Sequence, residues 1–347
     1  MTSSAPLAAI FGMAGSVLTE EERAFFQRVR PLGYILFARN IENPEQVADL
    51  TQQLRSLTPT DDPLILIDQE GGRVQRLIPP HWRFAPSMAE FGELYARNPE
   101  RGAKALKTNM TLIGRELCAL GIDVDCAPVM DVPVPGAHDV IGDRAFSTDP
   151  AVVAAMAPYA CDGLREAGVV PVIKHLPGHG RATSDSHKEL PVVAESLEAL
   201  KSSDFAPFKT LCAAQGQGVC FGMTAHVVYK SIDSEHPATT SKTIIGDIIR
   251  GEIGFEGLLM SDDLGMKALT GPFDERAAAS LEAGCDVVLH CDGTLVDMEA
   301  VAQGARPLGT KAMKSLADAS SVRLKPQTIF DNVLVAEFNV LDALRRG

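Results

Sequence analysis

The chain of 347 residues has little positive charge to set against its acidic residues. It carries 32 Lys and Arg against 45 Asp and Glu, a formal net charge of −13 at pH 7, and no basic run. A protein that binds nucleic acid needs a basic surface for the phosphates. We therefore expect no nucleic-acid partner, and we interpret the acidity as an aid to solubility.

Long apolar runs and paired cysteine motifs are also missing. No apolar run approaches the roughly 20 residues of a membrane-spanning helix, so no membrane role is indicated.

The seven cysteines are scattered and form no CxxC pair, which argues against a disulfide framework and suits a reducing compartment. The apolar N-terminus has no Lys or Arg before Arg23, which is atypical of a secretory signal. We expect a cytoplasmic protein.

Linkers, repeats and low-complexity tracts are absent as well. Hydrophobic residues make up 46% and charged residues 22%, which is ordinary globular composition. We predict one domain over residues 1–347, with extra helices from about residue 294.

Short apolar segments alternate with helical patterns along the chain. The candidate strands are residues 7–11, 34–37, 64–68, 122–128, 169–175, 219–226, 257–263 and 285–290. This alternation predicts parallel strands with right-handed crossovers, either an open doubly wound sheet or a closed barrel. Since there are eight such segments, we predict an α/β fold, a single-domain (β/α)8 TIM-type barrel.

Helix boundaries between these segments have local signals. Thr19 and Glu22 form a capping box, and two prolines follow capping side chains in Asn43-Pro44 and Asp149-Pro150. Helices are expected to end at Gly168 and Gly216.

Polar residues occur where the predicted strands end. These residues are Asp68, His175, His226, Asp262 and His290. In a barrel the carboxyl ends of the strands converge on one mouth, where active sites lie. The sequence therefore predicts an active site built from several of these residues.

The stretch KHLPGHGRATSDSH, residues 174–187, holds three of the eight histidines. A metal site is one interpretation, because His175 and His179 have a spacing seen in zinc proteins; an adjacent lysine and an intervening Pro-Gly pair count against it. A phosphate-binding loop is another, but the helix-leading glycine frame is missing. An exposed Gly/Pro-rich loop without a function is the third.

Proton transfer is the fourth interpretation. Residues two apart in an extended segment share a face, so the Asp185 carboxylate can orient the His187 ring. Imidazole titrates near neutrality and suits a general acid and base. Asp262 is the candidate nucleophile, because adjacent strand residues point to opposite faces and Asp263 is then structural or caps the next helix.

Carboxylates and arginines supply candidate contacts for an oxygen-rich ligand. Asp68 can accept hydrogen bonds from vicinal hydroxyl groups, and Arg76 suits such ligands. A local salt bridge is the alternative for Glu70 and Arg73. Arg144 is a ligand contact or a buried ion pair.

Taken in order, IDQEGGRVQRL, IGDRAFS, KHLPGHG with DSH, MTAHVVY and SDDLGM resemble motifs of single-domain β-N-acetylhexosaminidases of glycoside hydrolase family 3. The resemblance runs from about Ile10 to about His290. Leu176 departs from it, because the family often has phenylalanine there, which affects loop packing. The family's fold is a (β/α)8 barrel, in agreement with the predicted strands.

The resemblance implies a retaining exo-β-N-acetylglucosaminidase that needs no cofactor and no metal. It implies that Asp262 is the nucleophile and that His187, paired with Asp185, is the acid and base. The sugar is then held by Asp68, Arg76, Arg144, Lys174 and His175. The implied substrate is a muropeptide or disaccharide, N-acetylglucosamine β-1,4-linked to anhydro-N-acetylmuramic acid with or without peptide, in cell-wall recycling.

Two rival hypotheses remain at this point. A metal-dependent barrel hydrolase predicts bound zinc, and a non-catalytic sugar-binding protein predicts binding without turnover. We also expect the loop that carries His187 to be mobile and to close over substrate, and the protein to be a monomer or a weak homodimer.

Overall fold

The computed structural model describes residues 5–58, 62–214 and 220–323. Eight strands form a closed barrel in the order β1-β10-β9-β7-β5-β4-β3-β2. They are β1 (Leu7–Phe11), β2 (Pro31–Leu36), β3 (Leu64–Ile67), β4 (Val124–Asp125), β5 (Val170–Leu176), β7 (Phe221–Thr224), β9 (Leu259–Asp263) and β10 (Val287–His290). The predicted (β/α)8 barrel is confirmed.

All neighbouring strands of the barrel run parallel, and β1 closes it by pairing with β10. Each predicted strand segment overlaps an observed strand, although β2 begins three residues before its predicted segment and β4 is only two residues long. Residue 219, at the start of one predicted segment, lies outside the described residues. The strands have almost wholly buried side chains because the barrel interior and the surrounding helices cover both faces.

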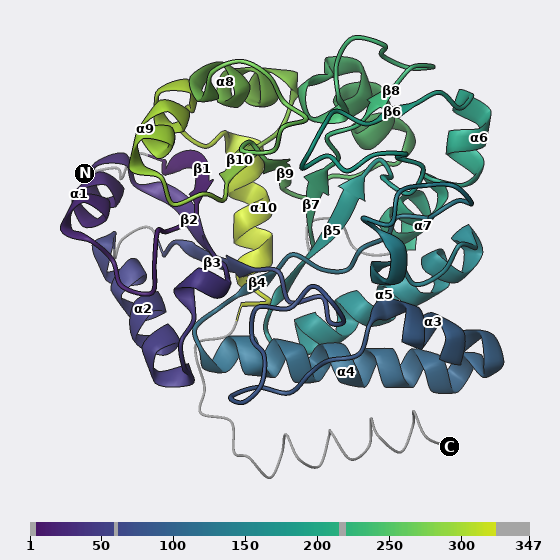
Figure 1. Ribbon diagram of the computed structural model, residues 1–347, viewed down its shortest axis with the longest axis horizontal. Coiled ribbons are helices and arrows are strands. Elements are labelled where there is room, and N and C mark those ends of the chain that lie inside the picture. Colours follow the sequence, from purple (N-terminus) through teal and green to yellow (C-terminus); the bar gives the residue numbers. More distant parts are fainter. Residues whose placement is uncertain (1–4, 59–61, 215–219, 324–347) are drawn as a thin grey trace.

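Helices surround the strands (Figure 1). They are α1 (Glu20–Val29), α2 (Pro44–Leu57), α3 (Met88–Arg97), α4 (Pro99–Ala119), α5 (Pro150–Glu166), α6 (Leu197–Ser202), α7 (Ala206–Ala214), a π-helix (Ile244–Glu252), α8 (Phe273–Ala283), α9 (Leu295–Gly304) and α10 (Thr310–Ser320). None of the described helices combines the length and apolar character needed to cross a bilayer.

The predicted helix caps are present. Thr19 accepts a hydrogen bond from the Glu22 amide, and Glu22 in turn accepts one from the Thr19 amide. Asn43 and Asp149 cap α2 and α5, each followed by proline. Helix α5 ends just before Gly168, whereas Gly216 lies outside the described residues.

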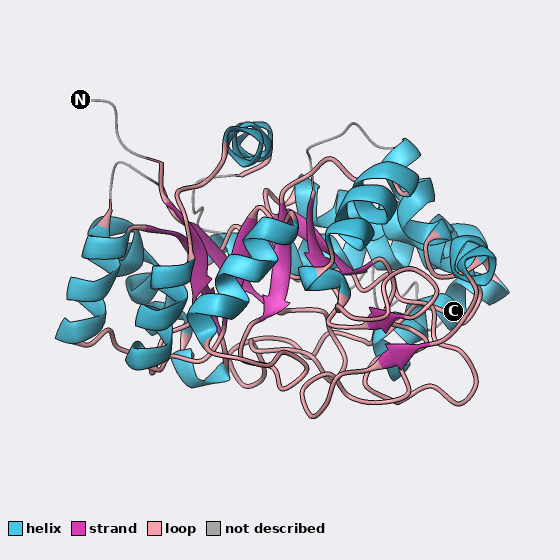
Figure 2. Ribbon diagram, turned by 90° about the horizontal axis from the view of Figure 1, so that it is seen from above, coloured by secondary structure: helices cyan, strands magenta, loops and turns pink. Residues whose placement is uncertain are grey.

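The two ends of the barrel differ. Figure 2 shows the strand arrowheads pointing toward the long loops, while α10 lies on the opposite side. The loops include two short strands that the sequence did not predict, β6 (Val192–Val193) and β8 (Val228–Tyr229). Helices α9 and α10 follow residue 294, and the division of the chain into a single domain with extra C-terminal helices stays a prediction.

Candidate active site

A cleft of about 630 Å³ opens at the carboxyl ends of the strands. All eight site residues proposed from the sequence line it: Asp68, Arg76, Arg144, Lys174, His175, Asp185, His187 and Asp262. They come from four barrel strands (β3, β4, β5 and β9) and the connections that follow them, so only the closed barrel brings them together.

Two of the predicted strand-end residues do not belong to this cleft. His226 is fully buried, and its ring contacts Thr239 Oγ1 and the Asp263 carbonyl. His290 is also fully buried and lies edge-on to the Phe273 ring. The sequence predicted a site built from several of the strand-end residues, and Asp68, His175 and Asp262 are the ones that line the cleft.

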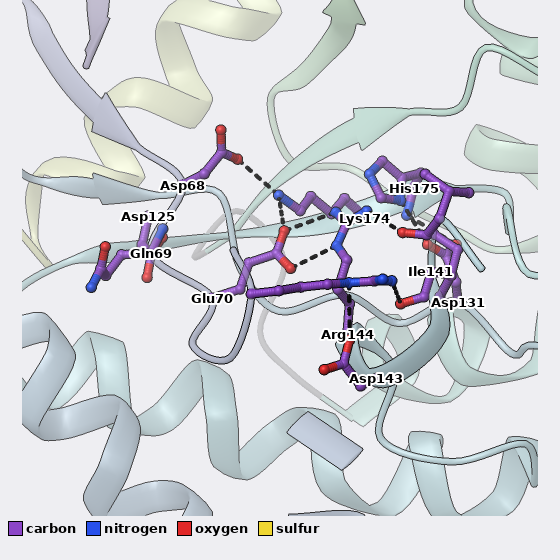
Figure 3. A network of polar contacts seen from close by, with 12 residues as sticks. Asp68, Gln69, Glu70, Asp125, Asp131, Ile141, Asp143, Arg144, Lys174 and His175 are labelled. Atoms are coloured by element: carbon purple, nitrogen blue, oxygen red, sulfur yellow. Dashed lines mark hydrogen bonds and ion pairs between the residues drawn. The ribbon is translucent and has the colours of Figure 1, made fainter. Parts of the chain in front are cut away.

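Lys174 is the centre of a buried ion-pair network on one wall of the cleft (Figure 3). Its ammonium group lies 2.9 Å from Asp68 Oδ1 and 2.7 Å from Glu70 Oε1. Burial lowers the pKa of Lys174, but the two carboxylates raise it well above its ordinary value. Lys174 is therefore a permanent cation in the cleft wall.

Glu70 and Arg144 form the second pair of this network. Arg144 donates from Nε and Nη2 to the two Glu70 oxygens, each at 2.9 Å. Burial raises the pKa of Glu70, but Arg144 and Lys174 lower it far more. The local Glu70 to Arg73 salt bridge considered from the sequence is not formed, since Arg73 pairs with Asp139 and Asp143.

Asp68 keeps part of its carboxylate open to the cleft. Lys174 and Arg76 donate to its two oxygens, the latter at 3.2 Å, and the side chain is 15% exposed. Burial raises the pKa of Asp68, but these two cations outweigh that effect and lower it overall. An ionised carboxylate with unused lone pairs suits sugar hydroxyl groups.

His175 is oriented by a residue that the sequence analysis missed. Its Nδ1 lies 2.6 Å from Asp131 Oδ2, and Asp131 Oδ1 accepts the backbone amides of His175 and His179. This leaves Nε2 of His175 as the ring nitrogen without an Asp131 contact. Asp131 lies in the VMDV segment, past the end of the predicted strand at residues 122–128, so no strand-end signal marks it.

Asp185 and His187 form the pair expected from their spacing. Asp185 Oδ1 lies 2.9 Å from His187 Nδ1 and accepts the His187 amide at 3.0 Å. Burial raises the pKa of Asp185, but the amide and ring of His187 lower it below its ordinary value. The ionised carboxylate thus holds one ring nitrogen, and the other is free for proton transfer.

Asp262 and Asp263 both contribute to the cleft lining, although their carboxylates have different partners. Asp263 Oδ1 accepts the amides of Gly265 and Cys291. It does not cap the next helix, because α8 begins at Phe273 after Pro272. These contacts suit a structural role for Asp263, which stays a prediction, but Asp262 and Asp263 both lie at the cleft although adjacent strand residues were expected to face opposite sides.

Asp262 lines the cleft as a half-buried residue, and its Oδ1 accepts the Asp263 amide. Burial raises the pKa of Asp262, but His226, His175, the Asp263 amide and His187 lower it below its ordinary value. The carboxylate is therefore ionised at neutral pH.

The other interpretations of the histidine-rich stretch can be compared with the observed contacts. Nε2 of His179 lies 3.3 Å from Ser186 Oγ, and Nδ1 of His175 contacts Asp131. Across the residues that the structure describes, no three His, Cys, Asp or Glu side chains are grouped as metal ligands would be.

The cleft is charged, lies at the mouth of a (β/α)8 barrel, and is lined by a carboxylate and by an imidazole that a second carboxylate holds. These are the groups that a (β/α)8 enzyme with nucleophilic and acid–base catalysis requires. Residues 14–324 match the family described as the glycosyl hydrolase family 3 N terminal domain. The β-hexosaminidase of Alkalilimnicola ehrlichii is 41% identical over 326 residues, covering 93% of this chain and 90% of the relative. That of Stenotrophomonas maltophilia is 39% identical over 309 residues, covering 88% and 90%.

Solved structures agree with these sequence relatives. NagZ from Neisseria gonorrhoeae, in complex with N-trifluoroacetyl-D-glucosamine, superimposes with a TM-score of 0.87 at 33% identity and covers 99% of both chains. The chain therefore belongs to glycosyl hydrolase family 3, and it is a glycosidase of the β-hexosaminidase type.

Proposed function

We propose that the protein is a retaining exo-β-N-acetylglucosaminidase of cell-wall recycling. Its proposed substrate is N-acetylglucosamine β-1,4-linked to anhydro-N-acetylmuramic acid, with or without the stem peptide. The observation that carries the proposal is that the ionised Asp262 and the Asp185-held His187 line one cleft. The N-trifluoroacetyl-D-glucosamine complex of the Neisseria relative supports an N-acylated glucosamine as the sugar.

The first chemical step joins the sugar to the enzyme. A carboxylate oxygen of Asp262 attacks the anomeric carbon while the bond to the leaving oxygen breaks. The imidazolium of His187 gives its proton to that oxygen, so the disaccharide's second sugar departs as an alcohol. The neutral imidazole remains beside the glycosyl-enzyme.

The second step releases the sugar. Neutral His187 takes a proton from a water molecule, whose oxygen attacks the anomeric carbon and displaces Asp262 as a carboxylate. Two inversions give overall retention. An imidazole can be protonated near neutral pH without the large pKa increase that a carboxylic acid would need, and it places no second negative charge beside Asp262.

The Lys174 network is proposed to hold the non-reducing sugar. Asp68 offers acceptors to hydroxyl groups, and Lys174 and Arg76 lie beside it as donors. A guanidinium has five N–H groups, and Glu70 and the Val140 carbonyl take three of those of Arg144. The others are available to the sugar, together with Nε2 of His175.

A reducing, cytoplasmic location is part of the same proposal. All seven cysteines are free thiols, and three of them are of intermediate exposure rather than buried. A protein that keeps seven unpaired thiols suits a compartment where they stay reduced.

The proposal is tested by hydrolysis of 4-nitrophenyl N-acetyl-β-glucosaminide and of the matching glucoside. The wild-type enzyme should turn over the first and strongly prefer it. Asp262→Ala should lose at least about a thousandfold in kcat while remaining folded, because it lacks the nucleophile. Asp263→Asn is the matched control, since its amide oxygen still accepts the Gly265 and Cys291 amides. Near-normal turnover by Asp262→Ala would rule out its proposed role.

A further inference from the structure

Residues 183–190 form the outer part of the loop between β5 and α6, and they carry Asp185 and His187. Ser186 is buried, with 3% of its surface exposed, and it is the one buried residue of this stretch. The neighbouring His187 side chain is 66% exposed. A small polar residue is thus packed inward between two residues of the proposed acid and base pair.

The residues just before this stretch are firmly attached to the barrel. The His179 amide donates to Asp131 Oδ1 at 2.6 Å, and the Gly178 carbonyl accepts from Tyr229. A Cβ at Gly180 would lie 2.0 Å from the Val132 carbonyl oxygen, so the two loops are in close contact there. His179 therefore belongs to a fixed part of the structure.

Ser186 supplies the tertiary hydrogen bonds of residues 183–190 within the described part of the chain. Its hydroxyl lies 3.3 Å from His179 Nε2, and its carbonyl accepts the Ala268 amide at 3.2 Å. The remaining hydrogen bonds of the stretch are local, such as those from the Lys188 and Glu189 amides to the Asp185 carbonyl. The hydroxyl bond to His179 is thus the side-chain hydrogen bond that joins the stretch to the barrel, beside the backbone bond from Ala268.

The His179 ring is suited to hold a neutral hydroxyl group. Burial lowers the pKa of His179 to about 4, with a further contribution from His175, so the ring is neutral at pH 7. It lies edge-on to the His175 ring, with centroids 5.6 Å apart, and its Nδ1 has no hydrogen-bond partner among the described residues. Ser186 is therefore the polar side chain that the ring engages.

We propose that the Ser186 hydroxyl and the His179 imidazole form a catch that seats residues 183–190 and thereby places His187 opposite Asp262. Ser186 and His179 are then positioning residues, which act through His187. The inference rests on the proposed function, because the consequence of a misplaced loop is impaired proton transfer. It assigns a task to the central serine of the DSH motif and to the histidine of the PGHG motif.

Ser186→Ala tests this catch with two N-acetylglucosaminides that differ in their leaving group. For the 4-methoxyphenyl glycoside, which needs a proton from His187, kcat/KM should fall about threefold to tenfold, the range expected for loss of one hydrogen bond. For the 2,4-dinitrophenyl glycoside, whose leaving group needs no proton, kcat/KM should stay within about twofold of the wild-type value. Ser184→Ala is the matched control in the same loop and should change neither.

A role in folding alone would lower both values together, because it reduces the amount of active enzyme. Equal losses on the two substrates, or no loss on either, would overturn the catch. The proposed function has its own readout, since it fails only if the wild-type enzyme does not turn over these substrates or if Asp262→Ala does.

The pairing itself is tested by a double-mutant cycle. His179→Phe keeps a planar ring beside His175 and removes both ring nitrogens. If the two side chains act as one catch, adding Ser186→Ala to His179→Phe should cause no further loss on the 4-methoxyphenyl glycoside. If the fold-losses in kcat/KM of the two single variants multiplied in the double variant, Ser186 would act independently of His179. Thermal unfolding of each variant identifies any loss of folded enzyme.

Discussion

Asp262 and His187 have contrasting surroundings, and each suits a different part of the proposed reaction. Asp262 is half-buried, and nearby histidines and an amide donor favour its ionised form. His187 is largely exposed and is held through Nδ1 by Asp185. A carboxylate nucleophile whose ionised form is favoured and an accessible imidazole that can transfer a proton are what double displacement requires.

The dependence of kcat/KM on the leaving group tests the role of His187. His187→Ala should lose about a hundredfold or more on a 4-methoxyphenyl N-acetylglucosaminide, because proton donation contributes about that much to such a step. On the 2,4-dinitrophenyl glycoside kcat/KM should change little. Measurement of both substrates with one preparation removes any effect of enzyme concentration, and equal losses would contradict the acid role.

The acid side of the pH profile tests the charge state of Asp262. Its pKa lies below the ordinary 3.8, and the lowering keeps the reactive carboxylate form populated as the pH falls. Therefore kcat/KM for the 4-methoxyphenyl glycoside should stay level from about pH 6 down to about pH 4.5, as long as the enzyme remains folded. An apparent pKa above about 5 on this limb would mean that the carboxyl is not stabilised as proposed.

At the residue scale, the sequence predicted which residues line the site better than it predicted which side chains contact one another. Asp185 and His187 share a face of one short segment, so their pairing follows from spacing. Asp131 and Arg144 find partners on other βα connections, 44 and 74 residues away along the chain. No local pattern specifies such partners, because the closure of the barrel brings them together.

At the scale of elements, α10 and residues 321–323 lie at the end of the barrel opposite the cleft. Arg323 follows α10 and donates from Nε at 3.0 Å and from Nη2 at 2.7 Å to Asp123, just before β4. Asp123 also accepts from Arg55 on α2 and from the Ile65 amide in β3. This cluster joins three parts of the chain at the amino-terminal ends of the strands.

Loss of Arg323 should therefore lower stability without affecting catalysis. Arg323→Ala is expected to reduce the free energy of unfolding by about 1–3 kcal/mol, the range for a hydrogen bond to a charged group, with kcat/KM unchanged. Urea unfolding measures the first quantity. Lys314→Ala, which removes the same charge from the exposed side of α10, is the control and should be nearly neutral. If the two variants were equally stable, the contact would have no stabilising role.

The elements that the sequence predicted share a strong local signal. The eight barrel strands are apolar runs separated by helices, and the caps at Thr19, Asn43 and Asp149 use side chains next to their own helices. The strands β6 and β8 have two residues each and form a small two-stranded sheet apart from the barrel. Their formation depends on how the two loops meet over the mouth, which a local pattern does not encode.

At the scale of the whole molecule, the closed barrel is the device that assembles the site. Strands far apart in sequence end at one mouth, so Asp68 after β3, Lys174 at the end of β5 and Asp262 in β9 share a cleft. The histidine-bearing loop then lies over that cleft from one side. The same arrangement separates stability, at the amino-terminal end of the strands, from chemistry at the carboxyl ends.

The central claim is that the reaction passes through a sugar bonded to Asp262. Its most direct test is mass spectrometry of peptides after inactivation with a 5-fluoro N-acetylglucosaminyl fluoride, which slows release of the glycosyl-enzyme. The account predicts one added sugar on the peptide that spans residues 259–266, with fragmentation assigning it to Asp262. A sugar on Asp263 or on any other residue, or turnover of the reagent with no labelled protein, would contradict it.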